Sequence, residues 1–109
     1  MRVWDVPPSV LCKNHLLGEH REIHAIWSIL TTGKRGYLHH PETIRWKGKL
    51  NALYLRHSMI ADEMIRRGYE HKSPLDRKFA SGSKTQTEFV DPPQKQIKIL
   101  RRKNCDCRI

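Results

Sequence analysis

The feature that most constrains the fold is a helical repeat of large apolar residues in the first third of the chain. The residues that share this face are Leu16, Ile23, Trp27 and Leu30, with Ile26 beside them. At about 100° per residue they fall within one narrow sector of a helix. We therefore predict an amphipathic helix that begins at Ser9 or Asn14 and ends at Thr31. Gly33 supplies the C-terminal stop.

A second helical pattern follows the polar stretch "GKRGYLHH". Pro41 suits a first helical turn, and Glu42 suits the positive end of the helix dipole. The pattern continues to Arg67 and stops at Gly68, which predicts one long helix at the centre of the core. Its apolar face comprises Trp46, Leu50, Leu53, Tyr54, His57, Ile60, Ala61 and Met64.

The last third of the chain predicts a loop and one shorter helix. Residues 71–88 are polar and rich in Ser, Gly and Lys, as in a long surface loop. The following helix has Asp91 as its N-cap, Pro92 as its first residue and Asn104 as its left-handed stop. We therefore predict an all-α fold: residues 1–109 form one compact domain of about three helices, with a long polar loop before the last.

The charge of the chain points to a polyanionic partner. Lys and Arg total 21 against 11 Asp and Glu, a net charge of +10 on 109 residues. Nucleic acid is the commonest partner of so basic a small domain. No apolar run reaches the roughly 20 residues of a membrane span, and "MRVWDVPPSV" lacks the apolar region of a secretory signal. We expect a cytoplasmic monomer that does not bind membranes.

The cysteines and histidines do not form a recognisable metal motif. Three cysteines are a sparse, odd set, so reduced thiols are expected, and "CDC" is too short for a zinc motif. His20 and His24 are spaced i, i+4, but no third ligand is obvious, and the order differs from His-Glu-x-x-His. We therefore expect no metal and no cofactor. A metal-dependent nuclease that uses these two histidines is an alternative, which chelator sensitivity would reveal.

A polar stripe borders the apolar face of the first helix. Seven residues turn a helix by about 700°, so His15 and Glu22 differ by only about 20°, with Glu19 between them. A partly desolvated glutamate has a raised pKa, which suits it to proton transfer. Arg21, to one side, can reach a phosphate. A solvated charged face explains the same spacing, so spacing alone leaves both interpretations open.

The run "HLLGEHRE" (residues 15–22) resembles the pyrimidine-dimer DNA glycosylases of the phage endonuclease V type. Arg2 near the terminus, "GKR" after the first helix and "KLNALYLRHSMIADEMIRRGYEH" extend the likeness over about residues 1–70. The resemblance implies a small all-α DNA-repair enzyme that is both a DNA glycosylase and an abasic-site lyase. Its expected substrate is damaged or abasic double-stranded DNA.

The resemblance also implies a mechanism and the residues that perform it. The N-terminal α-amine attacks sugar C1′, displaces the base and forms a Schiff base, and Glu22 assists base release and β-elimination. The implied catalytic residues are Met1 and Glu22. The residues expected to contact DNA are Arg2, His15, Arg21, Lys34 and Arg35.

An α-amine is a good choice of nucleophile on physical grounds. Its pKa of about 7.7–8.0 leaves far more neutral amine near pH 7 than a lysine with a pKa of about 10.4. Met1 stands where the family has a threonine, and Arg2 is too large for routine methionine removal, so we expect Met1 to remain. Ala25 replaces a further family arginine, and "QIKILRRKNCDCRI" lacks the family's aromatic C-terminal segment. The lesion therefore stays open, and a non-catalytic basic module that binds nucleic acid is the main alternative.

Overall fold

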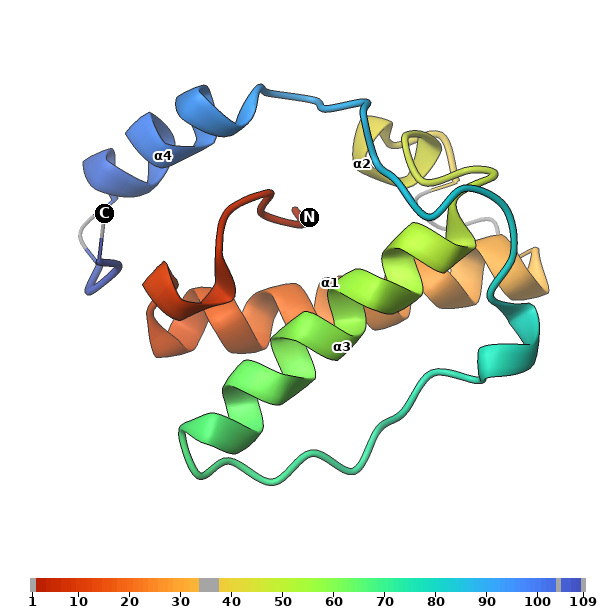
Figure 1. Cartoon of the computed structure of the whole chain (residues 1–109). Coiled ribbons are helices and arrows are strands. Elements are labelled where there is room, and N and C mark those ends of the chain that lie inside the picture. The colour runs from red at the N-terminus through yellow and green to blue at the C-terminus, as the bar shows by residue number, and fades with distance from the viewer. Residues whose placement is uncertain (1, 34–37, 104, 109) are drawn as a thin grey trace.

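The structure is a computed structural model that describes residues 2–33, 38–103 and 105–108. Its α-helices are α1 (Lys13–Thr32), α2 (Pro41–Ile44), α3 (Leu50–Arg66) and α4 (Pro93–Arg102), and short 3₁₀ turns occupy Pro8–Val10 and Arg77–Phe79. No strand occurs in the described part of the chain, so the all-α prediction is confirmed. In Figure 1, α1 and α3 pack across each other. The N-terminal segment (residues 2–6) lies between this pair and α4.

Helix α1 matches its prediction closely. It begins after Cys12, near the later of the two expected starts, and ends at Gly33, whose φ of 72° is the left-handed conformation that glycine adopts readily. The predicted face is inside the protein, where Leu16, Ile23 and Ile26 are fully buried. Apolar residues from the N-terminal segment and from α3 complete the core: Val3, Trp4, Val6, Leu11, Leu53, Ile60 and Met64.

The prediction of one helix from Pro41 to Arg67 is wrong, because the chain breaks between α2 and α3. Gly48 takes a φ of 72° at this break. The first N–H groups of α3 then pair with a distant loop: Asn51 donates to the Ser81 carbonyl (2.8 Å) and Ala52 to that of Ser83 (3.0 Å). These N–H groups have no partner inside a helix, so the loop stabilises the new helix start.

The long loop packs tightly where it meets this break. The N–H of Ser83 donates to the Gly48 carbonyl at 3.0 Å. A Cβ on Gly82, whose φ is 76°, would lie 2.0 Å from that same carbonyl oxygen. Only glycine fits so close to another backbone. The predicted polar loop therefore exists, but part of it caps α3 and its Leu75 joins the core.

Helix α4 begins one residue later than predicted. Its N-cap is Pro92, and Asp91, the expected N-cap, forms ion pairs with Arg2 (3.0 Å) and Lys95 (3.1 Å). The expected stop at Asn104 lies outside the described residues. Among the described residues, no helix has both the length and the apolar composition needed to cross a membrane.

Candidate active site around the N-terminal segment

Buried arginines hold the carbonyl groups of the N-terminal segment. Arg45, which follows α2, donates from Nη2 to the Val3 carbonyl at 3.1 Å. Arg56 of α3 donates from Nη1 to the Val6 carbonyl at 2.9 Å. Arg45 is only 4% exposed, so its charge needs partners in the interior. The carbonyl groups of Val3 and Val6 are thus held by side chains 42 and 50 positions away in the sequence.

Acceptors from α1 and α4 hold the N–H groups of the same segment. The N–H of Trp4 donates to Glu19 Oε1 at 2.9 Å, and the N–H of Asp5 donates to Gln96 Oε1 at 2.8 Å. Gln96 also donates through Nε2 to Asp5 Oδ2 at 2.9 Å. One backbone group of each residue from 3 to 6 is therefore hydrogen-bonded to a buried or half-buried side chain. These bonds leave the segment little conformational freedom.

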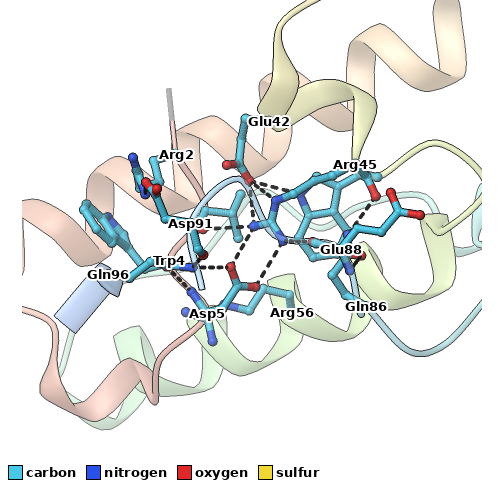
Figure 2. Close-up of polar contacts among 12 residues, drawn as sticks. Arg2, Trp4, Asp5, Glu42, Arg45, Arg56, Gln86, Glu88, Asp91 and Gln96 are labelled. Carbon is cyan, nitrogen blue, oxygen red and sulfur yellow. Dashed lines mark hydrogen bonds and ion pairs between the residues drawn. The ribbon is translucent and has the colours of Figure 1, made fainter. Parts of the chain in front are cut away.

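The Arg45 guanidinium is the centre of a buried ionic network (Figure 2). It lies 2.7 Å from Glu42 Oε1 and 3.0 Å from Asp5 Oδ2, and it donates to the Glu88 carbonyl at 3.0 Å. The indole Nε1 of Trp46 donates to the same Glu42 oxygen at 3.2 Å. Because every charge has an opposite partner and hydrogen bonds, the network can stay ionised inside the protein.

A second buried pair joins α1 to α3. Arg56 Nε donates to Glu19 Oε2 at 2.6 Å, and its Nη2 donates to Oε1 at 3.1 Å. Burial raises the pKa of Glu19, whose residue is 1% exposed, and the Arg56 charge opposes that shift. The partly desolvated glutamate expected on this stripe is therefore Glu19, and its contacts are structural.

Glu22, the expected catalytic glutamate, lies one turn beyond Glu19 along α1. Its side chain is half-buried, and no hydrogen bond or ion pair to its carboxylate occurs within the described parts of the chain. The expected nucleophile at Met1 and the expected DNA contacts of Lys34 and Arg35 lie outside the described residues.

The other predicted DNA-binding residues have different surroundings. Arg2 forms the ion pair with Asp91, and its guanidinium carbon lies 5.0 Å from the centre of the Trp4 ring. Arg21 is exposed on α1. His15 turns Nδ1 toward sulfur, 3.1 Å from Cys12 Sγ and 3.3 Å from Cys107 Sγ.

His15 belongs to the first of two groups of metal-ligating side chains, which we call the cysteine cluster: Cys12, His15, Cys105 and Cys107. The three cysteines are free thiols, as expected. Burial raises the pKa of Cys107 to about 12. Burial also acts to raise the pKa of Cys12, but the backbone N–H groups of His15 and Asn14 and the Cys107 thiol outweigh it, so that pKa is lowered.

The second group, the histidine cluster, comprises His20, His24, His57 and His71. No third ligand for His20 and His24 was evident in the sequence, and the fold brings two more imidazoles to them. Burial, followed by the neighbouring histidines, lowers the pKa of His20 and of His57 to about 4. These rings are therefore neutral at pH 7, the form in which an imidazole binds a metal.

Sequence reasoning missed three residues that hold the N-terminal segment, Arg45, Arg56 and Gln96, and it did not foresee that Glu42 pairs with Arg45. The only local signal is the i, i+3 spacing of Glu42 and Arg45, which is common on solvated helices. Arg56 and Gln96 lie on polar sides of their helical patterns, so nothing in their spacing indicates burial.

Comparisons with known proteins identify one family. The family model described as pyrimidine dimer DNA glycosylase matches residues 1–77, which include the N-terminal segment, α1, α2 and α3. A search of curated proteins and a search of solved structures returned no match.

Proposed function

The chain belongs to the pyrimidine dimer DNA glycosylase family, and from this premise we propose that it is a DNA glycosylase with abasic-site lyase activity. Damaged or abasic double-stranded DNA is the proposed substrate. The observation that carries the proposal is the N-terminal segment itself, whose backbone is held by Arg45, Glu19, Gln96 and Arg56. A reaction that depends on a backbone amine needs such a rigid support.

The proposed nucleophile is the α-amine of Met1. Its neutral nitrogen attacks sugar C1′, and the C1′–base bond breaks so that the base leaves with the electron pair and takes up a proton. The nitrogen loses one proton, and the C1′–O4′ bond of the sugar ring opens as O4′ is protonated, so that a protonated imine joins enzyme and sugar. Removal of a C2′ proton then expels the 3′ phosphate by β-elimination, which cuts the strand. None of these bond changes needs a metal at the reacting carbon, so we propose that this chemistry is metal-independent.

Glu22 is the proposed acid and base of these steps. The Trp4 N–H is bound to Glu19, and Figure 1 shows residues 2–6 running opposite in direction to α1, back toward the start of that helix. Followed from Trp4 back to Arg2, this segment therefore leads toward the later turns of α1, and the turn after Glu19 carries Glu22. Glu19 is committed to Arg56, whereas the Glu22 carboxylate has no such partner among the described residues. A carboxylate with no competing ion pair is able to exchange protons with a substrate.

The basic residues are proposed to bind the DNA backbone. Arg21 is exposed one residue before Glu22, and Arg2 belongs to the N-terminal segment and directly follows the proposed nucleophile in sequence. Lys34 and Arg35 remain predicted phosphate contacts. His15 remains one through its Nε2 atom, because its Nδ1 atom faces sulfur. The net charge of +10 supports this assignment, because phosphate neutralisation dominates the affinity of such proteins.

Glu22→Gln is expected to slow strand cleavage of abasic DNA by about 100-fold or more, since general acid–base groups contribute 10²–10⁴-fold. The measurement is cleavage together with borohydride trapping of the imine, on abasic and on ultraviolet-damaged duplexes. Glu70→Gln is the matched control, because Glu70 is 81% exposed and pairs only with Lys72 among the described residues. It should cleave like the wild type.

Two results would overturn the proposal. One is a wild-type protein that forms no borohydride adduct on either duplex, and the other is a Glu22→Gln variant with unchanged cleavage. Salt-sensitive DNA binding without any adduct would identify the chain as a non-catalytic nucleic-acid-binding module.

A further inference from the structure

All three cysteines and five of the seven histidines of this chain lie in two tight clusters. In the cysteine cluster and in the histidine cluster alike, four donor atoms lie within 4.8 Å of one another. We propose that each cluster binds one structural zinc ion. The zinc ions are proposed to hold the fold together, so this inference stands apart from the catalytic proposal.

The distances in the cysteine cluster fit a four-coordinate zinc. A zinc with bonds of about 2.3 Å to sulfur and 2.0–2.1 Å to nitrogen places S and N about 3.5–3.6 Å apart in a tetrahedron. The His15 Nδ1 atom is 3.1 Å from Cys12 Sγ and 3.3 Å from Cys107 Sγ. Outward movements of a few tenths of an ångström would admit the ion. Three cysteines and one histidine are a common ligand set of structural zinc.

The surroundings of the cysteine cluster suit thiolates. The N–H of Cys12 donates to Cys107 Sγ at 3.1 Å. Cys12 is also the N-cap residue of α1, at the helix end where unpaired N–H groups favour negative charge. Zinc binding releases the thiol protons to solvent. The three thiolates then outweigh the zinc charge by one, which is favourable in so basic a protein.

A zinc ion in the cysteine cluster would fasten the C-terminal end of the chain to the start of α1. Cys12 and Cys107 are 95 positions apart in sequence. The N–H of Arg108 already donates to the Val10 carbonyl at 2.7 Å, so the two segments lie side by side. Closing so long a loop removes much of the freedom of the unfolded chain. It would also secure α4, whose Gln96 holds Asp5.

The histidine cluster fits a tetrahedral ion even more closely. The Nε2 atoms of His57 and His24 are 3.2 Å apart, and those of His71 and His20 are 3.1 Å apart. Four nitrogens at 2.0–2.1 Å from zinc would be about 3.3–3.4 Å apart.

The ring positions of the histidine cluster agree with this geometry. Ring centres bound in the same way would lie about 5.2 Å apart, from the same bond length and the size of an imidazole. Five ring pairs of the cluster have centres 4.7 to 5.2 Å apart.

The histidine cluster joins three parts of the fold. His20 and His24 come from α1, His57 from α3, and His71 from the loop that follows α3. Hydrogen bonds between rings would explain the short distances within the two pairs, His57 with His24 and His71 with His20. They would not explain why the nitrogens of both pairs lie within 4.8 Å of one another, whereas one shared ion would. Neutral imidazole is a good ligand for zinc.

The decisive measurement is the zinc content of the untagged full-length protein, purified without chelators from zinc-supplemented cells. Two zinc ions per chain are expected. Less than one zinc per chain would overturn both sites. Cys105, Cys107 or Cys12 recovered in a disulfide, in place of bound zinc, would overturn the site in the cysteine cluster.

Single substitutions assign each ion to its cluster. Cys107→Ser and His71→Asn should each lose one zinc ion. Asp106→Asn, an exposed neighbour of Cys107, and His39→Asn, an exposed histidine outside the clusters, should lose none. A ligand variant that keeps both ions would overturn the corresponding site.

Cobalt substitution tests both sites in the wild-type protein, so the result does not depend on whether the variants fold. Wild-type protein loaded with Co²⁺ should show visible absorption of tetrahedral cobalt and a near-ultraviolet sulfur-to-cobalt charge-transfer band. A folded Cys107→Ser variant should lose the charge-transfer band, and His71→Asn should keep it. Wild-type protein without the charge-transfer band would overturn the site in the cysteine cluster. Tetrahedral absorption that is wholly lost with Cys107→Ser in a folded protein would overturn the site in the histidine cluster.

Discussion

A Gly-Ser extension ahead of Met1 is expected to abolish both borohydride trapping and strand cleavage on abasic DNA, with little change in DNA affinity. Each added residue moves the amine by up to about 3.3–3.6 Å. The amine then leaves its place while Trp4 and Asp5 stay held by Glu19 and Gln96. Misplacement of a reacting group by even 1 Å can cost about 100-fold in rate.

The matched control carries the same dipeptide at the C-terminus and should react like the wild type. Trapping and cleavage are measured on the same abasic duplex, and affinity is measured at fixed salt concentration. An extended protein that still traps at the wild-type rate would show that the imine does not require the α-amine of Met1. That result would contradict the N-terminal mechanism and leave the family assignment intact.

Arg56→Met is expected to lower the free energy of unfolding by about 3–5 kcal/mol, the usual cost of removing one member of a buried ion pair. The change leaves the Glu19 carboxylate, 1% exposed, without its bidentate partner. It also removes the donor to the Val6 carbonyl. Because domains of this kind are stable by only about 5–15 kcal/mol, the melting temperature should fall sharply. Chemical denaturation and thermal melting measure both quantities.

Two further variants separate the buried charge from other effects of Arg56→Met. Arg66→Met removes an arginine whose side chain is 64% exposed, and it should change stability by no more than about 1 kcal/mol. Glu19→Gln combined with Arg56→Met removes both charges, so it should be more stable than Arg56→Met alone. A double variant as unstable as the sum of the single changes would contradict the idea that the lone carboxylate causes the loss.

The helices were predictable where their patterns are local. The faces of α1 and α3 follow from the spacing of their apolar residues, and Gly33 and Gly68 mark helix ends with positive φ. The break before α3 was not predictable, because its stabilising partners are the Ser81 and Ser83 carbonyls, about 30 positions away. The helical spacing of apolar residues continues across this break, so the sequence pattern does not reveal it.

The candidate site was predictable in part. The run at residues 15–22 identified a family that the comparison confirms. The polar stripe of the first helix indicated Glu19 and Glu22 as candidate proton-transfer residues. Spacing could not distinguish the two glutamates. Only the position of Arg56 shows that Glu19 is bound in an ion pair.

What the sequence alone determined is the helical content of the chain, its basic charge and its family. Each of these depends on neighbouring residues, on sums over residues or on a contiguous motif. Only the tertiary structure decided how the N-terminal segment is held and how the cysteines and histidines gather. The contacts responsible join residues 15 to 95 positions apart, such as Trp4 with Glu19 and Cys12 with Cys107. Packing of the helices brings such residues together, and no local pattern records that packing.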